Sequence, residues 1–207
     1  MAQPRTDRGL ERLINFTDAS VAIAITLLIL PLVDVATQID HEPIGTLLHE
    51  NLGGLISFVV TFAVIGRFWL IHHRIFEYVE SYSRSMITAN FVWLISIVFL
   101  PFAANILSHR SGPAGISALY IGTMLVTTCA AGAIDWILVH DPSLTREAAR
   151  DDLRMSPAVI SAILMACALV VAVVFRQINL YALFLLMLGT PLQAWWDSRH
   201  RTASVDA

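Results

Sequence analysis

The chain alternates long apolar runs with short polar segments, and the first run sets the pattern. Residues 21–33 carry no charge, whereas Arg12 and the pair Thr17-Asp18 stand just before them. An apolar helix needs about 20 residues to cross a hydrocarbon core of about 30 Å. The run reaches that length only if Thr17 and Asp18 lie inside the membrane or at its edge. Because an intramembrane carboxylate is costly without a partner or water, we expect this helix to carry the function.

Five further runs have the length of membrane spans. The sequence therefore predicts an all-α polytopic membrane protein with six transmembrane helices in a single domain, residues 1–207. The predicted spans cover residues 13–33, 52–72, 86–107, 116–139, 157–175 and 180–196. An acidic connection follows the first span, and a charged linker, residues 140–154, follows the fourth.

Composition supports this class and excludes others. Hydrophobic residues make up 57% of the chain and charged residues only 14%, with a mean hydropathy of +0.69, which excludes an ordinary soluble domain. The net charge of −3 gives no sign of a nucleic-acid partner. Cys129 and Cys167 lie in apolar runs, as buried small hydrophobes do. The sequence shows no catalytic constellation, phosphate loop or metal motif, so we expect neither an enzyme nor a cofactor.

The placement of arginine predicts the orientation. The first, third, fifth and seventh hydrophilic segments hold most of the arginines, whereas the alternate segments hold only Arg110 and Arg176. Cytoplasmic loops are rich in basic residues, so both termini are predicted to be cytoplasmic. Asp34 then lies on the outer side, and Arg12 and Asp18 lie at the cytoplasmic end of the first helix.

A second regularity runs along the first span. Residues spaced four and three apart share one helix face. On this helix they are Phe16, Ser20, Ile23, Leu27, Leu30 and Asp34. If four or more copies of this face met around an axis, three aliphatic rings would close a pore and an acidic ring would mark its outer mouth. The alternative is that Ile23, Leu27 and Leu30 pack against neighbouring helices, because this spacing is common in buried helices.

Polar residues also gather in the cytoplasmic half of the second span. Arg67 has the same predicted depth as Asp18, and Trp69, His72 and His73 follow it closely. A contact between Asp18 and Arg67 or a histidine would lock the foot of the first helix. The alternative is that Arg67 and His72 extend to the interface and meet lipid phosphates. For His73 we expect the interface, and adjacent histidines on a helix form no chelating pair.

Three short motifs occur along the spans. They are Arg12-x-x-x-Phe16-Thr17-Asp18 followed by Ala22-Ile23-x-x-Thr26-Leu27-Leu28-x-Leu30, then Trp69-x-x-His72-His73-Arg74-x-Phe76, then Leu100-Pro101-Phe102. Together with the six-span layout they resemble the bacterial branch of the lysosomal potassium-channel family called transmembrane protein 175. The usual first motif reads RxxxFSD, and Thr17 stands here in place of its serine.

The resemblance implies a homotetramer in the bacterial inner (plasma) membrane, with the first helices lining a central pore permeable to K⁺ and other monovalent cations. Ile23, Leu27 and Leu30 would form its hydrophobic constriction, and Thr26 would contribute the preference for potassium. The motif network that holds the pore helix would comprise Arg12, Phe16, Thr17, Asp18, Arg67, Trp69, His72 and His73. The chain lacks a TVGYG-type carbonyl filter, so we expect modest selectivity.

Two other functions compete with a channel. A proton-coupled secondary transporter would use Asp18 and the histidines, and its saturable flux would depend on pH and vanish in Asp18→Asn. The internal repeats typical of many transporters are not evident between residues 1–103 and 104–207. A non-conducting membrane scaffold would form a folded oligomer that passes no ions. The motifs favour the channel.

Overall fold

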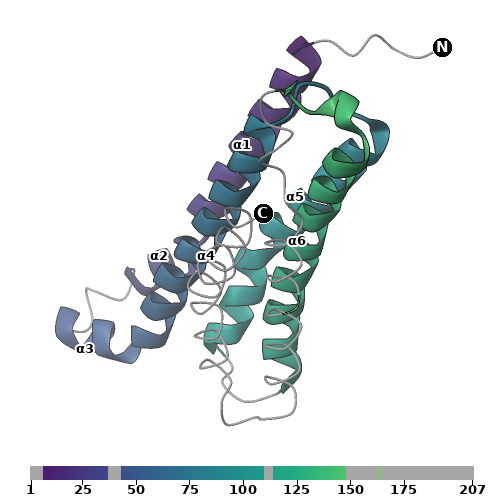
Figure 1. Ribbon diagram of the computed structural model, residues 1–207. Helices are drawn as coiled ribbons and strands as arrows, with labels where there is room; N and C mark the ends of the chain where they lie inside the picture. Colours follow the sequence, from purple (N-terminus) through teal and green to yellow (C-terminus); the bar gives the residue numbers. More distant parts are fainter. Residues whose placement is uncertain (1–6, 37–42, 110–113, 148–162, 164–207) are drawn as a thin grey trace, which may run out of the picture.

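The computed structural model describes residues 7–36, 43–109, 114–147 and 163, and in these ranges the chain is helical (Figure 1). In chain order the elements are α1 (Asp7–Leu27), α2 (Leu30–Ala36), α3 (Ile44–Glu50), α4 (Leu52–Glu77), α5 (Arg84–His109), α6 (Ala114–His140) and the 3-10 helix η1 (Pro142–Leu144). Apart from one isolated antiparallel bridge between Val79 and Thr145, the described ranges contain no strand pairing. The predicted all-α class is therefore confirmed.

Four segments are long and apolar enough to cross a membrane. They are Asp7–Val35, Leu52–Glu77, Arg84–Leu107 and Gly115–His140. Each of the first four predicted spans lies inside one of these segments, so these four predictions are confirmed. The predicted spans 157–175 and 180–196 lie outside the described residues. Six helices per protomer and a tetramer therefore stay predictions.

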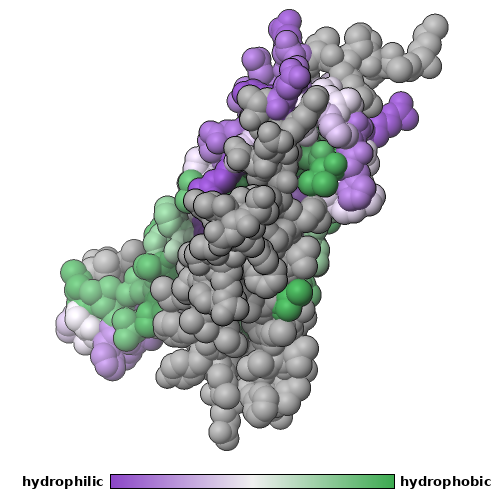
Figure 2. All heavy atoms as spheres, in the orientation of Figure 1, coloured by the Kyte–Doolittle hydropathy of each residue, from purple (hydrophilic) through white to green (hydrophobic). Residues whose placement is uncertain are grey.

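The helices stand side by side in alternating directions (Figure 1). α5 and α6 form the most extensively packed pair, and α1 contacts both α4 and α5. The start of α1, the α4–α5 turn and η1 gather at one end of the bundle, whereas α2 and α3 lie toward the other. Hydrophilic residues cluster at the end where α1 begins, and hydrophobic residues cover the region of α2 to α4 (Figure 2).

The first span, although confirmed in its extent, is broken near its end rather than one continuous helix. α1 ends at Leu27 and α2 begins at Leu30. Pro31 has no backbone N–H for the carbonyl four residues earlier, and its ring clashes with that carbonyl, so the α-helical pattern stops there. The amides of Leu28 and Ile29 instead bond three residues back, each at 3.3 Å, as in a tightened last turn.

Two short elements lie where the sequence analysis expected only polar connections. α3 occupies the segment between the first two spans, and it buries Leu47. After α6, η1 turns the chain back against the α4–α5 turn. The amides of Glu80 and Ser81 donate to the carbonyl of Leu144 at 2.8 and 3.2 Å, and the amide of Arg146 donates to the carbonyl of Tyr78 at 2.9 Å. The beginning of the predicted linker is therefore an ordered strap.

The core lies among α4, α5, α6 and the buried face of α1, and it combines large side chains with paired hydroxyls. Trp93 and Tyr120 are among the largest fully buried side chains. Thr127 Oγ1 donates to Ser96 Oγ at 2.8 Å across α5 and α6, and the hydroxyls of Thr61 and Tyr120 lie 3.2 Å apart. In a bilayer, where apolar burial does not distinguish protein from lipid, such bonds and close packing hold helices together.

Candidate functional site

The buried face of α1 determines how the helix sits against its neighbours. Leu10, Thr17, Val21 and Ala24 are its buried residues. Their spacing of seven, four and three places them along one side of the helix. Three of the four are apolar, whereas Thr17 brings a hydroxyl into full burial, with 0% of its surface exposed. The polar site is built around this hydroxyl.

A chain of hydrogen bonds joins Thr17 to α5 and α4. Thr17 Oγ1 donates to the carbonyl of Leu13 at 2.9 Å, and Asn90 Nδ2 donates to Thr17 Oγ1 at 2.9 Å. Since the Thr17 proton is engaged with Leu13, Thr17 can only accept from Asn90. Asn90 Oδ1 therefore faces His72 Nε2, 2.7 Å away, and the imidazole must donate. Asn90 and His72 are 0% and 1% exposed, so three helices meet at a buried amide whose nitrogen and oxygen both have a hydrogen-bond partner.

Asp18, the next residue of α1, bonds to a different partner on α4. Trp69 Nε1 donates to Asp18 Oδ1 at 2.8 Å. The contact of Asp18 with Arg67 or a histidine, which the sequence analysis weighed, is not the one formed among the described residues. Arg67 is exposed, because it lies two residues before Trp69 and therefore about 200° around α4 from the side chain that bonds to Asp18. A neutral indole donor thus serves the carboxylate in place of a cation.

The two histidines of α4 have different surroundings. His72 is sandwiched by aromatic rings, with centroid distances of 4.3 Å to Phe76 and 4.1 Å to Trp93. His73 is exposed, stacks on Trp69 at 5.3 Å and lies 3.6 Å from the carboxylate of Glu77. The interfacial position expected for His73 agrees with this exposure, whereas His72 belongs to the interior.

The remaining residues of the predicted motif network lie on the surface of the described protomer. Arg12 and Arg67 are exposed. Phe16 is also largely exposed, and its ring packs against Phe91 of α5 with centroids 6.1 Å apart. The structure therefore brings together Thr17, Asp18, Trp69 and His72 and leaves these three at its edge.

Asn90 has the central position in this network, although the sequence analysis gave it no role there. Its amide is the only group that bonds to both Thr17 and His72 among the described residues. The signal in the sequence was an amide within the apolar run of residues 86–107. Polar residues inside membrane helices are rare and usually paired, but spacing alone does not tell which helix supplies the partner.

The second half of α1 shows the opposite pattern. Ile23, Leu27 and Leu30 are 60%, 41% and 54% exposed in the protomer. Ile23 and Leu27 share one face of α1, whereas Leu30 and the exposed Asp34 lie beyond the helix break on α2. These aliphatic side chains do not form the protomer core. Among the helices that the structure describes, they therefore do not pack against neighbours in the way that the alternative requires.

The hydroxyls of this half bond to their own helix. Ser20 Oγ donates to the carbonyl of Phe16 at 2.8 Å, and Thr26 Oγ1 donates to the carbonyl of Ile23 at 2.8 Å. Both satisfy their donors locally, as hydroxyls in apolar helices commonly do. Thr26 is exposed, about 100° around the helix from Leu27. It lies beside the aliphatic face rather than in line with it.

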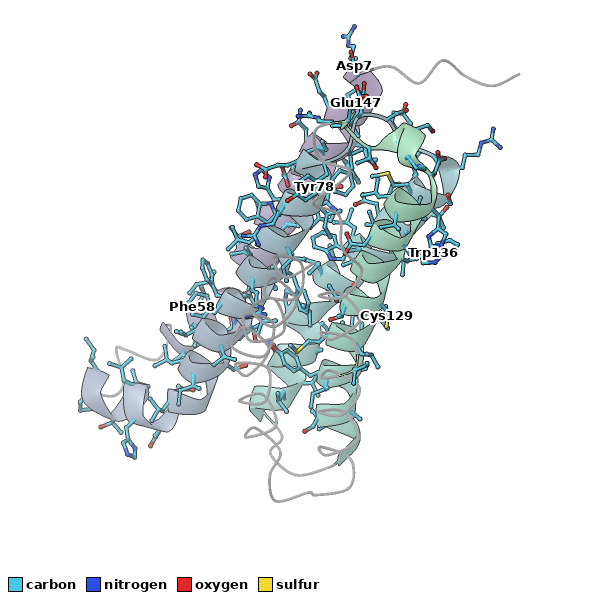
Figure 3. All side chains as sticks on the ribbon, viewed as in Figure 1. Asp7, Phe58, Tyr78, Cys129, Trp136 and Glu147 are labelled. Atoms are coloured by element: carbon cyan, nitrogen blue, oxygen red, sulfur yellow. The ribbon has the colours of Figure 1, made fainter. Side chains whose placement is uncertain are left out.

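The described residues give the two ends of α1 different surroundings. They contain no group of three or more His, Cys, Asp or Glu that could hold a metal ion. One end of α1 is anchored by buried hydrogen bonds, and the other displays an aliphatic surface. Asp7 and Glu147 mark the hydrophilic end of the bundle, and Phe58 lies toward the other end (Figure 3).

Four apolar helices with an intramembrane polar anchor define a polytopic helical membrane protein. The model of the family described as endosomal/lysosomal potassium channel TMEM175 matches residues 12–101. A potassium channel of Streptomyces collinus is 33% identical over 148 residues, which cover 65% of this chain and 69% of that protein. The chain belongs to the TMEM175 family. Members of this family are ion channels, so the expectation that the chain is not an enzyme is confirmed.

Further relatives carry two kinds of name. A potassium channel of Chamaesiphon minutus is 32% identical over 100 residues, covering 47% of this chain and 49% of that protein. An endosomal/lysosomal proton channel TMEM175 of Danio rerio is 26% identical over 102 residues, covering 47% of this chain but 19% of that protein.

The fold has a counterpart among solved structures. A lysosomal potassium-selective channel TMEM175 homolog from Chamaesiphon minutus superposes with a TM-score of 0.59, over 88% of this chain and 99% of that one. At 21% sequence identity, this likeness establishes the fold alone.

Proposed function

We propose that the chain is one subunit of a potassium-permeable cation channel whose constriction is formed by Ile23, Leu27 and Leu30. The observation that carries the proposal is the exposed aliphatic face of α1, which continues onto α2 beyond the break. Hydrophobic constrictions gate pores by expelling water, so aliphatic rings of this kind oppose ion passage until they widen. The names of the bacterial relatives support potassium as the permeant ion.

A single protomer supplies only one wall of such a pore. We infer that identical copies surround the axis as a homotetramer, as the family resemblance implies, so that each α1 contributes its exposed face. In this arrangement Asp34 lies at the outer mouth and Thr26 contributes a modest preference for potassium. The network around Asn90 then fixes the foot of each pore helix, because its bonds reach α4 and α5.

The distribution of charge supports the orientation that this function needs. Arg8 and Arg12 of α1 lie at the same end of the bundle as the α4–α5 turn and η1. Asp34 and Glu50 lie toward the opposite end, near α2 and α3. The basic end faces the cytoplasm by the positive-inside rule. We therefore propose a multi-pass protein of the inner (plasma) membrane with its amino terminus inside.

The test is potassium flux from proteoliposomes that contain purified wild type, Ile23→Ala or Leu27→Ala. Shortening either side chain widens the constriction and lowers its dewetting barrier, so we expect flux to rise several-fold. Ile95→Ala is the matched control, because Ile95 is 69% exposed on α5 and the same atoms are removed. Its flux should equal that of wild type.

Three outcomes decide the proposal. Increased flux in the α1 variants alone supports a pore lined by α1. No flux in any variant, with an intact oligomer, overturns the channel and leaves a scaffold. A saturable, pH-dependent flux that disappears in Asp18→Asn would instead indicate a proton-coupled transporter. Because the Danio rerio relative is named a proton channel, proton flux is measured in the same liposomes to rank the two ions.

A further inference from the structure

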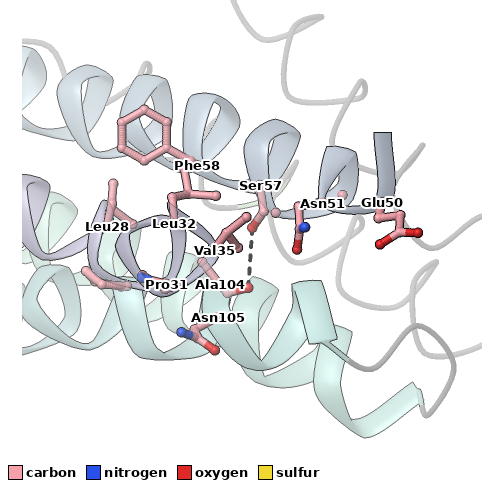
Figure 4. A pocket seen from close by; sticks show the side chains of 13 residues that line it. Leu28, Pro31, Leu32, Val35, Glu50, Asn51, Ser57, Phe58, Ala104 and Asn105 are labelled. Atoms are coloured by element: carbon pink, nitrogen blue, oxygen red, sulfur yellow. Dashed lines mark hydrogen bonds between the residues drawn. The ribbon is translucent and has the colours of Figure 1, made fainter. Parts of the chain in front are cut away.

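A cavity of about 270 Å³ lies beside the broken end of the first span. Its walls come from α2, from the α3–α4 junction with the first turns of α4, and from α5 (Figure 4). Drug-sized ligands occupy pockets of about 300–1,000 Å³, so this cavity has room for a smaller molecule. None of the residues assigned to the constriction or to the Asn90 network lines it.

The two ends of the cavity differ in chemistry. Leu28, Leu32 and Phe58 line one end, and Glu50 and Asn51 line the other (Figure 4). A ligand that fills the cavity therefore needs an apolar body and a polar head.

The polar side chains that line the cavity are the carboxylate of Glu50, the amides of Asn51 and Asn105 and the hydroxyl of Ser57, and none of them is a cation. Asn51 Nδ2 donates to the carbonyl of Leu47 at 2.9 Å, which leaves its Oδ1 for a ligand. The hydroxyl proton of Ser57 is engaged with the carbonyl of Ala104 at 3.3 Å. Glu50 supplies a carboxylate, and no Arg or His lines the cavity. A carboxylate beside an amide oxygen attracts a cation with N–H donors, and it repels an anion.

The cavity also touches the joint between α1 and α2. Leu28, Pro31 and Leu32 lie at and just after the helix break, and all three line the cavity. An occupant therefore packs against the break itself and against the start of α2, and it favours one arrangement of α2 relative to α1. A ligand shifts such an equilibrium by the difference in its affinity for the two arrangements.

We propose that this cavity binds a small amphiphilic ammonium ion, with the ammonium group at Glu50 and Asn51 and the alkyl chain against Leu28, Leu32 and Phe58. The occupant stabilises the α1–α2 joint and thereby changes conduction. Only this last effect rests on the proposed channel function. Binding itself is measured without ion flux.

The probe is hexylammonium, with 1-hexanol as its uncharged counterpart and KCl at equal ionic strength as the inorganic cation. The Tm of purified protein in nanodiscs reports binding. At about ten times Kd, hexylammonium should raise the Tm by about 4 °C. Glu50→Gln should remove most of this shift. Gly53→Leu should remove it by filling the cavity, since a Cβ at Gly53 meets no atom within 4 Å. Glu11→Gln, an exposed carboxylate of α1, is the matched control and should keep it.

Each outcome has a defined meaning. A shift with hexylammonium that Glu50→Gln abolishes and Glu11→Gln retains supports the site. An equal shift with 1-hexanol or with KCl overturns an ammonium amphiphile as the ligand. A shift that survives both Glu50→Gln and Gly53→Leu places binding elsewhere. If binding occurs as described but liposomes show no potassium flux in any condition, the site stands and the channel proposal fails.

Discussion

The two halves of the first membrane span contrast in almost every physical respect. The first half, around Thr17 and Asp18, is tied by side-chain hydrogen bonds to α4 and α5. The second half exposes Ile23 and Leu27, satisfies its hydroxyls locally and breaks before Pro31. The position of the first half is thus specified by partners on other helices, whereas the second half presents an exposed aliphatic surface on the described protomer.

This difference shows how a membrane helix can be held firmly and still present a functional surface. Because lipid is as apolar as leucine, aliphatic contacts alone do not fix how far a helix is rotated about its axis. A hydrogen bond between a buried donor and a buried acceptor does fix this rotation, because a polar group left unpaired in hydrocarbon costs free energy. The bonds at the foot therefore orient the face that carries Ile23 and Leu27.

Removal of Asn90 is expected to have the largest effect on this contrast. Asn90→Ala leaves Thr17 Oγ1 and His72 Nε2 without their partner and opens a small void. We expect the free energy of unfolding to fall by about 3 kcal/mol, or the Tm by about 9 °C. Thermal unfolding in nanodiscs measures the change. Asn15→Ala, at an exposed asparagine of α1, is the control and should change the Tm little. Equal losses in both variants would contradict a central role for Asn90.

A change at Thr17 should have a smaller effect that depends on the hydroxyl alone. Thr17→Val keeps the shape but removes the oxygen that accepts from Asn90, and we expect a loss of about 1 kcal/mol. Thr17→Ser keeps the oxygen and should approach wild-type stability. Thr88→Val removes an exposed hydroxyl bonded to its own helix and serves as the control. If Thr17→Val and Thr17→Ser were equally stable, the bond to Asn90 would contribute nothing.

Much of the fold could be predicted from hydrophobic periodicity. The first four spans follow directly from run length, because a bilayer imposes a minimum length that few other structures need. The grouping of Ile23 and Leu27 on one face of α1 was likewise visible in the four-and-three spacing from Phe16, whereas the exposure of that face was not, because the same spacing occurs in buried helices. The break before Leu30 was harder to predict, since proline is tolerated in many membrane helices and interrupts only some of them.

Partners across helices could not be predicted. Thr17 and Asn90 are 73 positions apart, and nothing in their local sequence pairs them. Asp18 was expected to contact Arg67 or a histidine, but the side of α4 that faces α1 carries the indole of Trp69. The contact of η1 with the α4–α5 turn could not be predicted either, because its hydrogen bonds use backbone atoms, which any sequence provides.

The most direct test of a pore lined by α1 is whether the exposed face of this helix meets water. Ile23→Cys and Ile95→Cys are made in a background with Cys129 and Cys167 replaced by alanine. Proteoliposomes are treated on both sides with a cationic, membrane-impermeant methanethiosulfonate, and potassium flux is measured before and after. Thiols react as thiolates, which form in water and not in lipid. If α1 lines the pore, modification occurs at Ile23→Cys and blocks flux, while Ile95→Cys is unaffected. Unmodified Ile23→Cys, or modification without loss of flux, would contradict a pore lined by α1.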